Sequence, residues 1–107
     1  MRIRAHKQFR QDFKTLSKKY PSLESDMDEL ADALRENPTL GQPLGKNLYK
    51  VRLKIKSKGK GKSGGGRIIT YLRLSEDELC LLTLYHKSEM ENVNDAFLDD
   101  LVARIDE

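Results

Sequence analysis

Hydrophobic residues recur along the chain with two different periods, and the change of period marks out the predicted elements. Over His6–Lys19 and Ser22–Glu36 apolar side chains return every three or four residues, which is the spacing of an amphipathic helix. These side chains are Phe9, Phe13, Leu16 and Tyr20 in the first segment and Leu23, Met27, Leu30 and Leu34 in the second. Pro21 and Ser22 separate the segments, and we expect Ser22 to cap the second helix. The pattern predicts a helical hairpin.

After the turn-rich connector Asn37–Lys46 the pattern becomes typical of strands. Three strands are predicted, over Leu48–Ile55, Arg67–Leu74 and Leu79–His86, and the short link Ser75–Glu78 makes the last two a hairpin. The last strand is apolar on both faces. We therefore expect it in the centre of the sheet, with the helices covering one side.

The two ends of the chain complete the predicted fold. Met1–Ala5 is a candidate short strand, and Asn94 and Asp95 open a final helix. The inward residues of this helix are Phe97, Leu98, Leu101, Val102 and Ile105. The order predicts an α+β fold in which the N-terminal strand and helical hairpin pack on a small, mostly antiparallel sheet followed by a C-terminal helix. A length of 107 residues suits one domain, so we assign residues 1–107 to it.

The segment Lys50–Arg67 carries eight basic residues and no acidic one. Its first half alternates, so that four cations share one face of the predicted strand and four apolar residues share the other. The cations are Lys50, Arg52, Lys54 and Lys56, and the apolar residues are Tyr49, Val51, Leu53 and Ile55. A loop that we expect to be flexible, Ser57–Gly66, extends this surface with Lys58, Lys60 and Lys62. Such a surface suits a polyanion, most commonly RNA or DNA.

Charge and cysteine content narrow the class of protein. The net charge is only +3, because Ser75–Glu107 holds ten acidic residues against two basic ones. The single cysteine, Cys80, excludes an internal disulfide and a cysteine zinc site, and we expect it in the core. No apolar segment is long enough to span a membrane and the N-terminus lacks a signal-like apolar stretch, which predicts a soluble cytoplasmic protein without a membrane partner.

Several catalytic chemistries do not fit the residues. The loop G-K-G-K-S-G-G-G misses the phosphate-binding P-loop pattern because Lys56 stands where a glycine is required, and because a strand follows it instead of a helix. The two histidines, His6 and His86, have no carboxylates at ligand spacing, so we expect no metal site and no cofactor. Paired carboxylates are also disfavoured, because the cationic face carries no acid.

Cationic chemistry remains. Arg67 follows three glycines, which allow close approach to a phosphate, and Lys87 follows the last strand beside Tyr85 and His86. Tyr71 lies on the face that carries Arg67. RNA supplies its own nucleophile, the 2′-hydroxyl, so arginine and lysine side chains can promote its cleavage without a metal.

Three stretches of the sequence resemble the RelE/HigB family, within the RelE/ParE superfamily of bacterial toxins. They are Y-K-V-R-L-K, S-K-G-K-G-K-S-G-G-G-R-I-I-T-Y and L-L-T-L-Y-H-K-S-E-M, and the glycine-lysine loop is most like the HigB branch. The resemblance covers essentially the whole chain. It implies a type II toxin with a fold like small microbial ribonucleases, which cuts mRNA in the ribosomal A site and inhibits translation. It also implies a neighbouring antitoxin partner, which we expect to be a helix-turn-helix DNA-binding protein.

The resemblance also suggests roles for residues. The family's basic positions match Lys50 and Arg52 with Lys54 adjacent, then Arg67 and Lys87. Together with Tyr85 this gives a candidate catalytic set of Arg52, Lys54, Arg67, Tyr85 and Lys87. The candidate RNA-binding set is Lys50, Lys56, Lys58, Lys60, Lys62, Tyr71 and His86. Some members use a tyrosine near the C-terminus where this chain has Val93, which leaves Tyr85 or a lysine as the general base.

Two other functions remain as alternatives. A ParE-like poison of DNA gyrase would share the fold but would need no nuclease residues, and the basic strand with Lys87 favours the nuclease over it. A non-catalytic RNA-binding module would need stacked aromatic residues, whereas only Tyr49 and Tyr71 accompany the cations.

Overall fold

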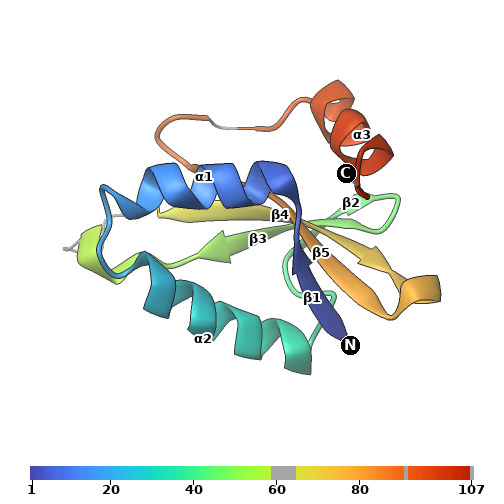
Figure 1. Ribbon diagram of the computed structural model, residues 1–107, viewed down its shortest axis with the longest axis horizontal. Coiled ribbons are helices and arrows are strands. Elements are labelled where there is room, and N and C mark those ends of the chain that lie inside the picture. The colour runs from blue at the N-terminus through green and yellow to red at the C-terminus, as the bar shows by residue number, and fades with distance from the viewer. Residues whose placement is uncertain (59–64, 91, 107) are drawn as a thin grey trace.

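The computed structural model describes residues 1–58, 65–90 and 92–106. Its elements in chain order are β1 (Arg2–Ala5), α1 (Lys7–Ser17), α2 (Leu23–Glu36), β2 (Gln42–Gly45), β3 (Leu48–Leu53), the 3-10 turn η1 (Lys56–Lys58), β4 (Gly66–Arg73), the 3-10 turn η2 (Leu74–Glu76), β5 (Glu78–His86) and α3 (Asp95–Ala103). Figure 1 shows the strands as one sheet between helices. The predicted α+β class is confirmed.

The sheet has five strands in the order β1-β5-β4-β3-β2. β1 runs parallel to β5 and every other pair is antiparallel. β1 reaches only as far as the pair Ala5 and Leu81, and beyond it α1 covers the open edge of β5. There the carboxylate of Asp12 accepts hydrogen bonds from the Leu84 amide at 3.1 Å and the Thr83 hydroxyl at 2.6 Å. An unpaired strand edge is thereby closed by a side chain.

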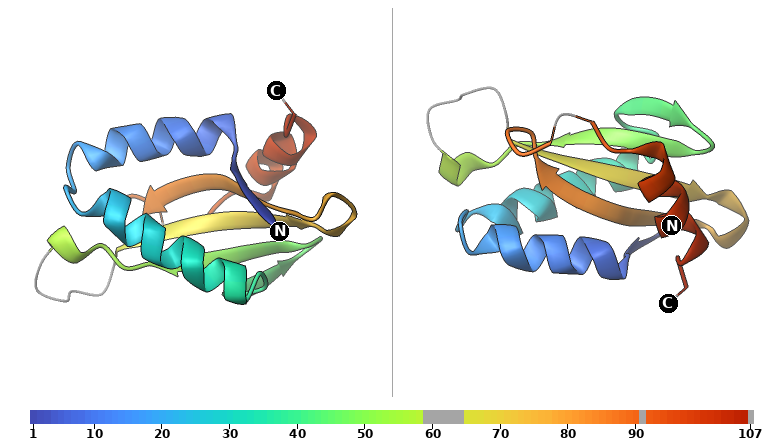
Figure 2. Two further views of the ribbon diagram at one scale, coloured as in Figure 1. Left: turned by 60° about the horizontal axis from the view of Figure 1, so that its bottom comes forward. Right: turned by 90° about the horizontal axis from the view of Figure 1, so that it is seen from above.

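Helices pack on both faces of the sheet, which corrects the expectation that they would cover one. Side chains of α1 and α2 form one buried cluster with Val51, Ile68 and Leu79. Leu98 and Leu101 of α3 form a second cluster on the opposite face. Figure 2 shows α3 on the side of the sheet away from α2. The physical reason is β5, which lies between β1 and β4 and not in the centre of the sheet as predicted, because an inner strand that is apolar on both faces requires cover on both.

The connector before β3 also differs from the prediction, since it contains β2. Pro43 pairs with Tyr49 at the sheet edge, where a missing amide hydrogen is tolerated. Lys46 and Asn47 then turn the chain with φ values of 55° and 65°, as a two-residue hairpin loop of type I′ requires. The proline and glycines of this segment favoured a turn-rich connector, so the short edge strand β2 was not predicted.

The helix starts are only partly as predicted. The Asn94 side chain caps α3 by accepting hydrogen bonds from the Ala96 and Phe97 amides, as expected for a helix opening there. Ser22 is the N-cap residue of α2, but its side chain makes no capping hydrogen bond, which corrects the expectation that it would cap the helix. Its hydroxyl donates instead to the buried carboxylate of Asp26 at 2.6 Å.

Cys80 lies fully buried in β5, in agreement with the predicted core position. Burial raises the pKa of its thiol to about 11. Among the residues described here, the structure contains no helix with the length and hydrophobicity needed to cross a membrane.

Candidate active site

A row of three predicted catalytic residues crosses strands β3, β4 and β5 near one end of the sheet. In the strand register, Arg52 of β3 lies opposite Arg67 of β4, which lies opposite Tyr85 of β5. Directly opposed residues have Cβ atoms about 4.5–5.5 Å apart, so the three side chains are neighbours on one face. Arg52 is exposed and Arg67 is half-buried. We call this set the arginine–tyrosine row.

Glycines before β4 determine where Arg67 lies. Gly65 has φ +69°, and a Cβ atom there would come within 2.8 Å of the Leu53 carbonyl oxygen. β4 starts at Gly66, whose carbonyl oxygen accepts a hydrogen bond of 3.0 Å from the Arg67 guanidinium. The glycines therefore allow β4 to enter tightly against β3, which is a packing role besides the phosphate approach inferred from the sequence.

Lys87 lies at the same end of the sheet. Its backbone amide donates a 3.0 Å hydrogen bond to the carbonyl oxygen of Gly65, so the residue after β5 is held beside the entry to β4. Its side chain is exposed. Arg67 and Lys87 thus come from adjacent strand ends, as the sequence predicted for their backbone positions.

Tyr85 lies in the row but does not offer its hydroxyl to solvent. The residue is 6% exposed, and within the described part of the chain its buried hydroxyl has no hydrogen-bond partner. Burial raises the pKa of the phenol, and the nearby Arg67 charge only partly opposes this effect. At neutral pH Tyr85 is therefore an uncharged phenol, which disfavours the role of general base.

Lys50 and Lys54 flank the row from β3. Lys50 is half-buried, and its ammonium lies 3.5 Å from the side-chain oxygen of Asn92. Lys50 also lines a hollow of about 260 Å³ together with Val93. Lys54 is exposed immediately beyond the end of β3. Val93 therefore lies beside the cationic strand β3.

Lys56 turns away from the other cations toward α2. Its ammonium pairs with the carboxylate of Glu29, and this hydrogen bond raises the Lys56 pKa. Its backbone amide donates to Asp26 at 3.2 Å. Lys60 and Lys62, which were predicted to bind RNA, lie outside the described residues, as does the side chain of Lys58.

Two aromatic members of the predicted RNA-binding set are not beside the row. Tyr71 is half-buried, pairs with Leu48 across the strands and packs against the cluster under α3. His86 is only 2% exposed, and its ring stacks on Tyr20 at 5.6 Å. His86 therefore lies on the face of the sheet opposite Tyr85, because successive side chains along β5 point to opposite faces.

The start of the glycine-lysine loop is held by contacts that the sequence pattern does not reveal. The Ser57 amide donates to the Ser22 hydroxyl at 2.8 Å, and the Ser22 amide donates to the Ser57 hydroxyl at 3.2 Å. The Asp26 carboxylate joins this contact by accepting hydrogen bonds from the Ser22 hydroxyl and the Lys56 amide. No local pattern signals such a contact, because 35 residues separate the two serines.

The exposed half of this sheet face can hold a phosphate among several cations. Arg52 and Arg67 are permanently charged forks that match phosphate oxygens, and Lys50, Lys54 and Lys87 surround them. In the described ranges, no three residues among the histidines, cysteines, aspartates and glutamates gather into a group able to hold a metal ion.

Comparison with known proteins defines the fold class. No protein-family model matches the sequence, and no curated protein matches it either. The chain has the fold of the RelE toxin. The solved structures similar to it include an arginine-to-alanine double mutant of E. coli toxin RelE in the free state, with a TM-score of 0.63, 14% identity, and 97% of this chain and 96% of that chain covered. A copper-bound mutant toxin from Helicobacter pylori matches with a TM-score of 0.47 and 26% identity, over 84% of this chain and 98% of that one.

Proposed function

We propose that this protein is the toxin of a type II toxin–antitoxin system and that it cleaves mRNA on the ribosome. The observation that carries the proposal is the arginine–tyrosine row, which lies on a RelE-type sheet with Lys50, Lys54 and Lys87 around it. A poison of gyrase needs no such set of residues. The proposed partners are the translating ribosome, its mRNA and a cognate antitoxin, which places the toxin in the cytoplasm.

The proposed reaction is transesterification. The 2′-oxygen bonds to the adjacent phosphorus, the bond from phosphorus to the 5′-oxygen breaks, and a 2′,3′-cyclic phosphate and a 5′-hydroxyl result. Arg67 and Arg52 stabilise the extra negative charge of the pentavalent phosphorane. Lys87 donates the proton that the leaving 5′-oxygen takes up, and Lys54 is the candidate for accepting the 2′-hydroxyl proton. Tyr85 supports the position of Arg67.

Single-turnover cleavage on programmed ribosomes tests the proposal. We expect Arg67→Ala to slow the cleavage step by about 10²–10³, as for the loss of one transition-state donor. We expect Lys87→Ala to slow it by roughly 10²–10⁴ if Lys87 is the general acid. Lys46→Ala, an exposed cation in the β2–β3 turn, is the matched control and should cleave like the wild type. Circular dichroism verifies that each variant folds.

The nature of the products and the order of cellular effects provide independent tests. A 5′-phosphate on the downstream fragment would contradict attack by the 2′-hydroxyl. After induction in bacteria, amino-acid incorporation should stop before thymidine incorporation. The reverse order, with induction of the SOS response, would favour gyrase poisoning. Full-rate cleavage by both variants would remove Arg67 and Lys87 from the site.

A further inference from the structure

The outer face of α1 carries a second row of cations, which the proposed active site does not use. Its members recur every three or four residues, within roughly 80° of arc at ~100° per residue. They are Lys7, Arg10 and Lys14 of α1 and its C-cap residue Lys18, and all four are exposed. The buried residues Phe9 and Leu16 lie on the opposite side of the helix. We call these four cations the α1 stripe.

Among the described residues, the α1 stripe holds its charges outside ion pairs, although Arg10 lines one hollow together with Glu24 and Asp28. None of its four members forms a salt bridge with another residue that the structure describes, although the adjacent Lys19 pairs with Glu89 at 3.6 Å. The only acid of α1, Asp12, faces the sheet and binds Thr83 and Leu84. The exposed acids of the neighbouring helix show the contrast: α2 carries Glu24, Asp28, Glu29, Asp32 and Glu36. A face that only needs to be soluble usually mixes both signs, whereas this one has a single sign.

The α1 stripe meets the proposed active site at one end of the molecule. Tyr20, two residues after Lys18, stacks on His86 with an angle of 17° between the rings. His86 stands between Tyr85 and Lys87 in the chain. Figures 1 and 2 show the C-terminal end of α1, η1 and the start of β4 together at this end of the sheet. The C-terminal end of the α1 stripe therefore lies at the same end of the sheet as Lys87, and Lys19 pairs with Glu89 there.

The composition of the α1 stripe indicates which polyanion it fits. The other exposed residues of α1 are polar, namely Gln11, Thr15 and Ser17, and the helix exposes no large apolar side chain. A protein partner would need an apolar centre in its contact surface. The hollow beside α1 and α2, which does contain Phe13 and Met27, is bordered by Glu24 and Asp28, whose charges disfavour an acidic peptide. A phosphate backbone needs only evenly spaced cations.

We propose that the α1 stripe is a second binding surface for the phosphate backbone of RNA. In this proposal, RNA that is bound at the arginine–tyrosine row continues around the end of the sheet and along α1. This path rests on the proposed function, because it starts at the proposed active site. The stripe contributes affinity and orientation and takes no part in the chemical step, because α1 lies on the face of the sheet opposite Arg67.

Salt-dependent binding of uncleavable RNA tests the inference. The probe is a single-stranded 2′-O-methyl RNA in a long and a short form, about 24 and about 4 nucleotides, measured by fluorescence anisotropy. The stripe variant is Lys14→Gln with Lys18→Gln, and the control variant with the same charge change is Arg35→Gln with Lys46→Gln. Since each phosphate contact on a single strand contributes ~0.7 to the slope of log K against log salt, the stripe variant should lose about 1.4 on the long RNA. It should bind the short RNA like the wild type.

Each alternative outcome overturns the inference in a recognisable way. If the slope of log K against log salt on long RNA is the same for the stripe variant and the wild type, the α1 stripe does not bind RNA. An equal loss in the control variant means that only net charge matters. An unchanged RNA slope with weaker inhibition by an antitoxin would assign the stripe to a protein partner. Because the probe cannot be cleaved, a wild type that binds through the stripe but cuts no mRNA would contradict only the proposed function.

Discussion

Arg67 and Tyr85 are direct cross-strand partners in the antiparallel pairing of β4 with β5. The guanidinium charge favours the phenolate and burial favours the phenol, and burial has the larger effect on the Tyr85 pKa. A neutral, buried hydroxyl can donate a hydrogen bond but is poorly suited to accept a proton from RNA. The pairing of a buried, neutral Tyr85 with Arg67 therefore disfavours Tyr85 as the general base.

We predict that Tyr85→Phe stabilises the protein and leaves cleavage within tenfold of the wild type. The change removes a buried hydroxyl that has no hydrogen-bond partner among the described residues, and such a group costs roughly 1–3 kcal/mol. Urea unfolding should therefore show a gain in the free energy of unfolding of about 1 kcal/mol. A loss of cleavage above 10²-fold in a folded Tyr85→Phe variant would return Tyr85 to the chemistry.

We predict that Glu29→Gln strengthens RNA binding. The Lys56 ammonium pairs with the Glu29 carboxylate. Replacing this carboxylate by an amide makes the Lys56 charge available to phosphate. It also removes one negative charge that repels phosphate. The slope of log K against log salt should become steeper by about 0.7 on single-stranded RNA. Asp32→Asn, on the same helix and paired with Arg35, is the control for the loss of one negative charge. Equal effects of both substitutions would contradict a specific release of Lys56.

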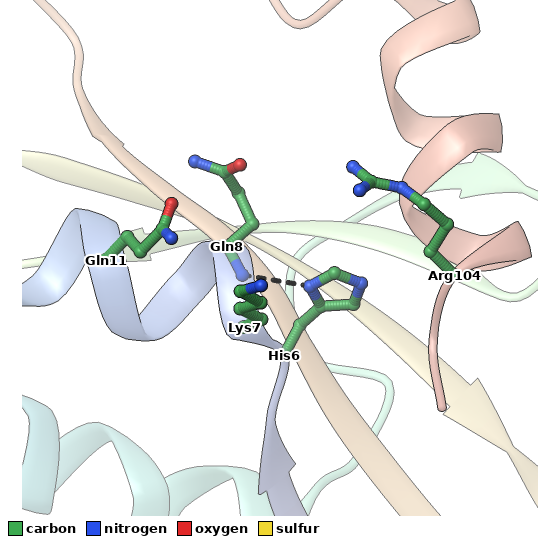
Figure 3. A pocket seen from close by; sticks show the side chains of 5 residues that line it. All are labelled: His6, Lys7, Gln8, Gln11 and Arg104. Carbon is green, nitrogen blue, oxygen red and sulfur yellow. Dashed lines mark hydrogen bonds between the residues drawn. The ribbon is translucent and has the colours of Figure 1, made fainter. Parts of the chain in front are cut away.

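We predict that His6 holds α3 to the start of α1. Its buried ring accepts a hydrogen bond from the Gln8 amide at 3.0 Å and donates one to the Leu101 carbonyl oxygen at 3.0 Å (Figure 3 draws the first). His6→Ala loses both bonds and should cost about 2–3 kcal/mol of stability. His6→Asn restores the helix cap, worth about 1 kcal/mol, but is too short to reach Leu101.

Hydrogen exchange distinguishes the two contributions of His6. Amides of α3 should exchange faster in both His6 variants, whereas those of the central strands β4 and β5 should change only with global stability. Lys7→Ala, an exposed neighbour, serves as the control. Unaltered exchange of α3 relative to the strands in His6→Asn would show that the Leu101 contact does not hold the helix.

We predict that Cys80 makes stability fall at alkaline pH. Its folded pKa of about 11 lies above the ordinary value of 9.0, because burial disfavours the thiolate. Below pH 9 the thiol is neutral in both the folded and the unfolded chain, so the free energy of unfolding is at its full value. As the pH rises from 9 to about 11 the thiol ionises only in the unfolded chain, and the free energy of unfolding falls. Between pH 8 and 11 the wild type should lose roughly 1–3 kcal/mol more than Cys80→Ala. Parallel urea-derived curves for the two proteins would contradict this linkage.

Local patterns in the sequence were sufficient to predict most elements and the faces of β3. The alternation over Leu48–Ile55 placed Val51 in the core and Arg52 in solvent, because a strand directs successive side chains to opposite faces. Arg67 and Lys87 were placed at neighbouring strand ends because the short Ser75–Glu78 link allows only an antiparallel hairpin. Helical spacing likewise placed Leu98 and Leu101 on the inner side of α3.

Contacts between distant residues were decided only by the tertiary structure. The sequence does not show which face a C-terminal helix will cover, so the position of α3, and with it the burial of Tyr71, depended on the apolar area of β5 that α1 and α2 leave open. On the other face, the packing of the chain after α1 against the end of β5 brings the Tyr20 and His86 rings together.

The charges of the site illustrate the same division. The sequence by itself determined that eight cations stand together without an acid between Lys50 and Arg67. Only the fold decided that Lys56 pairs with Glu29 and that Arg52 and Arg67 stand side by side, because an ion pair or a cross-strand neighbour depends on the register and packing of segments far apart in the chain.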